Sequence, residues 1–275
     1  MNITKIIIPA AGIGSRFLPI TKSIPKEMLP LSNKPAIEYI VQEAADAKLH
    51  DVMIVLSPNK TVIIDYFSHN HHLEKILEEQ NKLYYLSSVN KLIDSVNFQY
   101  FIQNKPLGLA NALLHVQAAI DDDEFFAVAL PDDIILPTDS NNTPEIEYLM
   151  QAAQQTQGMV IGVQEVPQHL VSSYGIVSCK QQISQNCFEI ASLVEKPSLE
   201  DAPSNLAIVG RYVFHQKLFE YIPKTIRVRS EILLPDTINL MIQHGFPVYA
   251  VKIQGKRFDT GTPKGLLEFI LHEAQ

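Results

Sequence analysis

Apolar runs that alternate with amphipathic stretches are the feature that most restricts how this chain can fold. The runs are ITKIIIP, DVMIVLS, NFQYFIQ and FFAVALP, all within the first half of the sequence. Between the first two, Ile37, Ile40, Val41 and Ala44 fall on one face of a helix. Strands that are apolar on both faces are typical of a parallel sheet covered by helices on each side. The pattern predicts an α/β fold with a doubly wound, mostly parallel mixed sheet.

The pattern changes after about residue 140. GMVIGVQEV, YGIVSC, FEIASLVEK and AIVGRYVF have strand character and short connections, which indicates added antiparallel strands. A helix over 232–243, a strand at PVYAVKI and a helix from Pro263 should complete the chain. We expect one domain over 1–275, built from halves of about 1–140 and about 141–275.

Bulk properties exclude several classes of protein. The net charge of −8 disfavours binding of a nucleic-acid polymer, which requires an excess of cations. No apolar run approaches the ~18 residues that would span a bilayer, and the N-terminal run leads into a glycine loop without the pattern of a signal peptide. The two cysteines, Cys179 and Cys187, fit neither a zinc site nor a disulfide framework. We therefore expect a cytoplasmic protein without a membrane partner.

A glycine loop follows the first apolar run, in IIIPAAGIGSRFLPITKSIPKEMLP. A dinucleotide-binding loop needs a third small residue, and a P-loop needs a second glycine; Phe17 stands at both positions. The loop is therefore neither. Three prolines prevent a regular helix and stiffen the segment that carries Arg16 and Lys26. Together with free backbone N–H groups, these cations indicate a cradle for a polyphosphate.

The segment PAAGIGSRFLPITKSIPKEMLPLSNKPAIEY resembles the signature of the sugar-nucleotide pyrophosphorylases, roughly G-x-G-[ST]-R-x-x-P-x-T-x(4)-K. The resemblance continues through ALPDDII, SSYGIVS, LVEKPSLEDAPSNLAIVGRYVF and GKRFDTGTPKGLLEF, and so covers almost the whole chain. EKP followed by APSNLAIVGRY favours the uridylyltransferase branch. The resemblance implies a Rossmann-like nucleotidyltransferase fold, with a nucleotide-binding first half and a sugar-binding second half.

The family also implies roles for individual residues. Arg16 would contact the phosphates that leave as pyrophosphate, and Lys26 the α-phosphate. The remaining implied sets are nucleotide-binding Ala11, Gly12, Gly14, Gln103 and Gly108; sugar-phosphate-binding Gly175, Glu195 and Lys196; and Asp132 and Asp259 as ligands of Mg²⁺.

The implied reaction is UTP plus glucose 1-phosphate giving UDP-glucose and pyrophosphate, in a homo-oligomer (a dimer or tetramer). Two departures leave the base open. Gly108-Leu109-Ala110-Asn111-Ala112 and Asp259-Thr260-Gly261-Thr262 are closer to the thymidylyltransferase branch, so dTTP is an alternative substrate. Another sugar 1-phosphate is also possible, as is a non-catalytic regulatory protein. Retention of the cations and carboxylates named above argues against the regulatory alternative.

Overall fold

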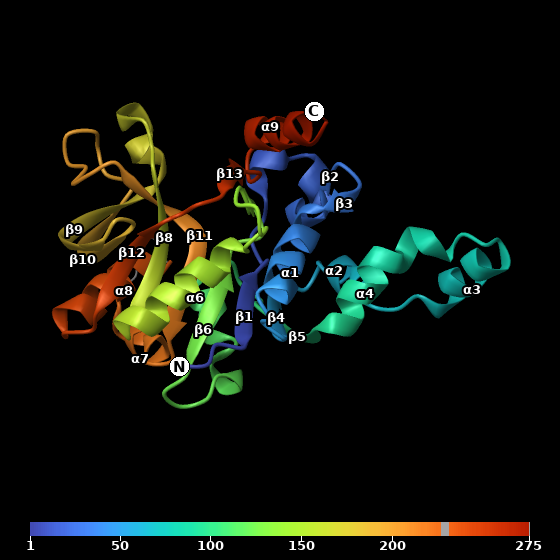
Figure 1. The fold of residues 1–275 in the computed structure, drawn as a ribbon, viewed down its shortest axis with the longest axis horizontal. Helices are drawn as coiled ribbons and strands as arrows, with labels where there is room; N and C mark the ends of the chain where they lie inside the picture. Colours follow the sequence, from blue (N-terminus) through green and yellow to red (C-terminus); the bar gives the residue numbers. More distant parts are fainter. Residues whose placement is uncertain (227–230, 275) are drawn as a thin grey trace.

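The fold is a mixed sheet between two layers of helices (Figure 1). The structure is a computed structural model that describes residues 1–226 and 231–274. Nine strands of the described residues form the main sheet, in the order β5 (Asn97–Ile102), β4 (Asp51–Leu56), β1 (Lys5–Pro9), β6 (Phe125–Ala129), β11 (Leu206–His215), β8 (Met159–Glu165), β12 (Val248–Lys252), β10 (Cys187–Glu195) and β9 (Gly175–Ser184). The predicted mixed α/β sheet is confirmed.

Parallel pairing is confined to two parts of this sheet. β5, β4, β1 and β6 are parallel to one another, and β12 is parallel to β8. β11 runs antiparallel to both β6 and β8 and joins the two parts, while β9 and β10 form an antiparallel hairpin at one edge. The sheet therefore contains fewer parallel strand pairs than the predicted, mostly parallel sheet would have.

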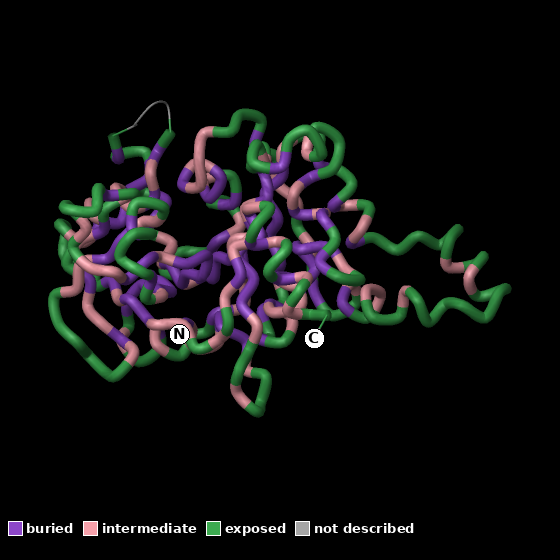
Figure 2. Tube along the Cα trace, turned by 90° about the horizontal axis from the view of Figure 1, so that it is seen from above, coloured by how far each residue is buried: buried purple, intermediate pink, exposed green. Residues whose placement is uncertain are grey.

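Helices cover both faces of the sheet because side chains alternate across each strand. Ile6 and Ile8 of β1 join a core under α1, α6 and α9, whereas Ile7 joins a second core under α5, α7 and α8. Figure 2 shows this buried interior. The helices span α1 (Ala36–Asp46), α2 (Val62–Tyr66), α3 (His71–Glu79), α4 (Ser87–Ser95), α5 (Leu109–Leu114), α6 (Glu145–Thr156), α7 (Leu218–Tyr221), α8 (Leu234–Gln243) and α9 (Pro263–Glu273).

One segment lies outside these layers. The segment with α3 and α4 projects from the body, and none of the side chains of α3 is buried (Figures 1 and 2).

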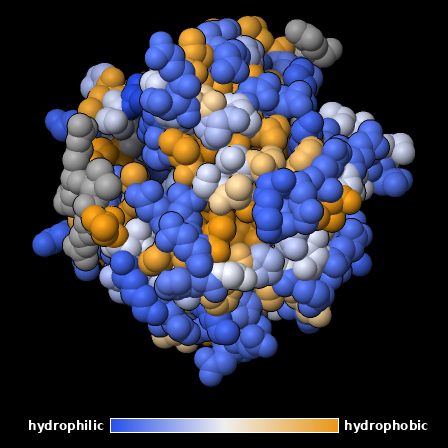
Figure 3. Space-filling view, turned by 90° about the vertical axis from the view of Figure 1, so that its left-hand side faces the viewer, coloured by the Kyte–Doolittle hydropathy of each residue, from blue (hydrophilic) through white to orange (hydrophobic). Residues whose placement is uncertain are grey.

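The face on the β9–β10 side is mostly hydrophilic, with hydrophobic side chains gathered near its middle (Figure 3). Among the described residues, no helix combines the length and apolar character needed to cross a membrane.

The helix predicted over 232–243 begins two residues later, at Leu234. Pro235 lies in its first turn, where a missing backbone N–H breaks no intrahelical bond. The proline therefore fits the start of α8.

A buried ion pair ties α1 to the centre of the sheet. The Arg211 side chain of β11 is completely buried, and its Nε and Nη2 donate to the Glu43 carboxylate at 2.6 to 3.1 Å. A buried charge is tolerated only with such pairing, because desolvation of a lone ion costs several kcal/mol. The pair fixes the helix that follows the glycine loop against β11.

Candidate active site

The glycine loop leaves the carboxyl end of β1 and is followed by short 3₁₀ turns only. These are η1 (Ser15–Phe17), η2 (Ile20–Lys22) and η3 (Lys26–Met28), so the predicted absence of a regular helix is confirmed. Gly14 has φ +72°, a conformation that other residues rarely adopt, and its carbonyl accepts a hydrogen bond from Thr21 Oγ1 at 2.8 Å. Phe17 is buried at the base of the segment. The side chain whose bulk excludes a dinucleotide-binding loop and a P-loop is therefore a buried packing residue of this segment.

Lys60 stabilises the conformation of the glycine loop. It lies just after β4, is 5% exposed, and donates to the carbonyl oxygens of Ala10 and Gly12 at 2.6 Å each. The same ammonium group donates to both carboxylate oxygens of Glu27, at 2.9 and 2.7 Å. Burial lowers the pKa of Lys60, and the attraction of Glu27 only partly opposes this. One buried cation therefore joins the glycine loop to the turn that carries Lys26.

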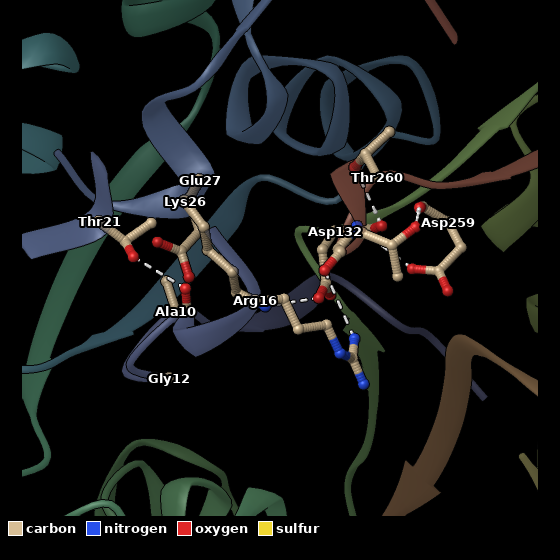
Figure 4. Close-up of polar contacts among 12 residues, drawn as sticks. Ala10, Gly12, Arg16, Thr21, Lys26, Glu27, Asp132, Asp259 and Thr260 are labelled. Carbon is tan, nitrogen blue, oxygen red and sulfur yellow. Dashed lines mark hydrogen bonds and ion pairs between the residues drawn. The ribbon is translucent and has the colours of Figure 1, made fainter. Parts of the chain in front are cut away.

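Lys26 and Asp132 form an ion pair where the loop faces the sheet (Figure 4), with 2.5 Å between Nζ and Oδ2. Each side chain keeps about a fifth of its surface exposed, at 19% and 23%. Burial alone would lower the pKa of Lys26, but Asp132 and Glu27 together raise it. Burial alone would raise the pKa of Asp132, and the attraction and hydrogen bond of Lys26 lower it instead. Both groups are therefore charged near neutral pH.

A two-stranded sheet brings Asp259 beside Asp132. β7 (Asp133–Leu136) pairs antiparallel with β13 (Lys256–Asp259), and Asp133 lies opposite Asp259. Thr260 Oγ1 donates to the carbonyl oxygen of Asp132 at 3.0 Å, which closes the end of this sheet. Residues 127 positions apart in the sequence thus reach one site, at the edge of the sheet where ligands of such folds bind.

Asp133 holds this arrangement in place. Its carboxylate accepts hydrogen bonds from the backbone N–H of Gly210, at 2.7 Å, and from Arg257 Nε, at 2.5 Å. Asp133 is therefore a positioning residue between β7, β11 and β13.

Burial raises the pKa of Asp259, the neighbouring Asp133 raises it further, and Arg257 opposes the rise.

Two adjoining hollows contain all the predicted site residues. The loop hollow, of about 380 Å³, is lined by Ala11, Gly12, Gly14, Lys26, Gln103, Gly108 and Asp132. The hairpin hollow, of about 330 Å³, is lined by Arg16, Gly108, Asp132, Gly175, Glu195, Lys196 and Asp259. Gly108 and Asp132 belong to both, so the hollows meet beside the ion pair of Lys26.

The β9–β10 hairpin forms one wall of the hairpin hollow. Gly175 lies opposite Glu195, and a Cβ at Gly175 would stand 3.2 Å from Glu195 Oε2. Lys196 follows with φ +45°, and its exposed side chain lies 3.5 Å from the Glu195 carboxylate. The Glu195 carboxylate can accept hydrogen bonds, and the Lys196 ammonium is a cation on a long side chain. Together they suit a ligand with hydroxyl groups and a phosphate.

The two carboxylates fit a magnesium ion that is shared with a phosphate ligand. Described residues include no group of three or more His, Cys, Asp or Glu side chains able to hold a metal alone. Mg²⁺ usually needs only one or two carboxylates besides phosphate oxygens and water. A Cβ at Gly261 would lie 2.5 Å from Asp132 Oδ2 and 3.1 Å from Asp259 Oδ1, so this glycine keeps open the space between them.

No site role was predicted for Lys60, Asn111 or Arg257. The signal for Lys60 is its position after DVMIVLS, at the same end of the parallel strands as the glycine loop. Asn111 was noted only as a departure from the family pattern. Arg257 had no local signal, because its partner lies 124 residues away.

Comparison with known proteins identifies the family of the chain. The nucleotidyl transferase family model matches residues 5–275. The chain belongs to this family. It is 41% identical over 274 residues to the UTP--glucose-1-phosphate uridylyltransferase of Staphylococcus haemolyticus, covering 99% of this chain and 93% of that protein.

Solved structures support the same family. A UDP-glucose pyrophosphorylase complexed with UDP-glucose is 35% identical, with a TM-score of 0.90 and coverage of 99% of each chain. A UTP-bound UGPase from Acinetobacter baumannii is 36% identical, with a TM-score of 0.90 and coverage of 99% of this chain and 93% of the other. The predicted nucleotidyltransferase fold and enzyme class are confirmed.

Proposed function

We propose that this nucleotidyl transferase is magnesium-dependent and makes UDP-glucose and pyrophosphate from UTP and glucose 1-phosphate. The observation that carries the proposal is the junction of the two hollows, where Lys26, Asp132 and Asp259 meet below the glycine loop. Substrate identity is supported by similarity to a uridylyltransferase and to pyrophosphorylase structures named for UTP and UDP-glucose.

In this proposal the loop hollow receives UTP. The backbone N–H groups of the glycine loop bind the β- and γ-phosphates, and Lys26 binds the α-phosphate. Arg16 lines the adjoining hairpin hollow and contacts the same β- and γ-phosphates from there. Gln103 and Gly108 contact the base. The hairpin hollow receives glucose 1-phosphate, with Gly175 and Glu195 at the sugar hydroxyls and Lys196 at the phosphate.

The reaction then consists of one substitution at the α-phosphorus. A phosphate oxygen of glucose 1-phosphate forms a bond to that phosphorus, and the bond to the β-phosphate bridging oxygen breaks as pyrophosphate leaves. The attacking phosphate is already ionised near neutral pH, so no general base is required. Alignment and positive charge supply the catalysis. Mg²⁺, held by Asp132 and Asp259, would neutralise phosphate charge when bound.

Pyrophosphate release tests this function directly. The purified chain is incubated with Mg²⁺, one of UTP, dTTP, CTP or ATP, and one of several sugar 1-phosphates. We expect the highest kcat/KM for UTP with glucose 1-phosphate. A preference for dTTP would favour the thymidylyltransferase alternative, and the absence of turnover with every pair would favour the regulatory alternative.

Asp259→Asn tests the proposed metal ligand. The amide keeps the size of the side chain but removes its negative charge, so we expect kcat to fall about 100-fold and the Mg²⁺ concentration for half-maximal rate to rise about tenfold. A Mg²⁺ titration of the initial rate measures both. Asp122→Asn, in the exposed turn before β6, is the matched control and should change neither quantity. An unchanged titration curve for Asp259→Asn would remove Asp259 from the metal site.

A further inference from the structure

Gln103 lies at the carboxyl end of β5, with its side chain at the loop hollow. Only 4% of the residue is exposed, and its backbone N–H donates to the carbonyl oxygen of Leu56 at 2.8 Å, which continues the pairing of β5 with β4. The backbone is therefore fixed. What this residue offers to a ligand depends on which way its side-chain amide is turned.

The carbonyl oxygen of Gly108, which can only accept, sets the direction of the Gln103 amide, and Asn111 Oδ1 accepts its second hydrogen at shorter range. Gln103 Nε2 donates to Asn111 Oδ1 at 2.8 Å and, over a longer distance of 3.4 Å, to the carbonyl oxygen of Gly108. An amide NH₂ group has two hydrogens, so both are used. Within the described ranges, 1–226 and 231–274, no hydrogen bond is found at Gln103 Oε1. The side chain therefore presents an acceptor, and not a donor, to the loop hollow.

A lone acceptor distinguishes between pyrimidine bases. Uracil and thymine carry a single donor on the pairing edge, N3–H, between two carbonyl oxygens. Cytosine has an unprotonated N3 and places its donor on the exocyclic N4. A base seated with N3–H on Gln103 Oε1 therefore loses this bond when cytosine replaces uracil, and two acceptors then face each other. Thymine keeps the bond, because its methyl group lies elsewhere on the ring.

We infer that Asn111 is a specificity-determining positioning residue, which holds the Gln103 amide so that Oε1 selects UTP and dTTP over CTP. The inference rests on the proposed function for the presence of a pyrimidine nucleotide in the loop hollow. It also separates two kinds of discrimination: Asn111 rejects cytosine, and the choice between UTP and dTTP depends on other groups, those near the 5-methyl and the 2′-hydroxyl positions.

The test measures equilibrium dissociation constants of UTP, CTP and dTTP with Mg²⁺ by calorimetry. Asn111→Leu has the same branched shape but no acceptor, so the Gln103 amide can turn and offer its N–H group. We expect the preference for UTP over CTP to fall about tenfold, while the ratio of UTP to dTTP stays unchanged. Asn111→Asp keeps an acceptor oxygen in the first turn of α5, where a negative charge is favourable, and should retain the preference. Asn111→Ala replaces the leucine variant if that variant does not fold.

Three results would overturn the inference. One is an unmodified chain that binds CTP as tightly as UTP. Another is an Asn111→Leu chain that keeps its preference for UTP over CTP. The third is a parallel fall in both ratios, which would indicate general loosening of the hollow. Because binding is measured separately from turnover, a chain that prefers UTP to CTP but releases no pyrophosphate would contradict the proposed function while leaving this inference intact.

Discussion

Lys26→Ala should reduce kcat about 1,000-fold without unfolding the protein. The ammonium group lies beside Asp132 at the junction of the hollows, and Asp132 and Glu27 keep it protonated. Charge grows on the phosphates during the substitution, so a cation fixed at this point stabilises the transition state more than the bound substrates. The expected loss is therefore mainly in kcat and less in KM. Steady-state rates of pyrophosphate release measure both parameters.

Lys75→Ala is the control for loss of a lysine as such. Lys75 is exposed on α3, in the segment that projects from the body, and its removal should leave kcat unchanged. A thermal melt of both variants checks folding, because Asp132 loses its partner in Lys26→Ala. If Lys26→Ala is folded and keeps more than about a tenth of the wild-type kcat, the proposed contact with the α-phosphate is wrong.

The parts of the site that could be predicted are those encoded locally. β1 and the glycine loop are contiguous, and the rule that ligands bind at the carboxyl ends of parallel strands placed Asp132 at the same end as Gly12 and Gly14. Local pattern also predicted the strand character and the antiparallel arrangement of β9 and β10. These predictions needed only hydrophobic periodicity, turn residues and a recognisable motif.

Other features depend on partners distant in the sequence. AIVGRYVF has the pattern of a buried strand, but nothing near Arg211 indicates that its charge is paired with Glu43 of α1. The insertion of antiparallel β11 between β6 and β8 likewise depends on tertiary packing, and this reduced the parallel share of the sheet. The contact of Asn111 with Gln103 spans only eight residues, but no local pattern predicts that these two side chains meet.

Lys60 provides the second large effect, because it is both a buried charge and a support of the glycine loop. Lys60→Met removes the donor to the Ala10 and Gly12 carbonyl oxygens and leaves the Glu27 carboxylate, only 1% exposed, without its cation. Breaking a buried pair in this way costs about 3–5 kcal/mol, and we expect that loss in the free energy of unfolding measured with urea. Lys264→Met, which breaks an exposed pair with Glu268, should cost less than about 0.5 kcal/mol.

A double variant separates the two roles of Lys60. Lys60→Met combined with Glu27→Met removes both charges, and replacing a buried pair by apolar side chains is often neutral for stability. We therefore expect the free energy of unfolding to recover. The loop carbonyls still lack their donor, so kcat/KM for UTP should stay about tenfold or more below that of the wild type. If kcat/KM recovers together with stability, Lys60 acts through stability alone, and the glycine loop keeps its shape without that lysine.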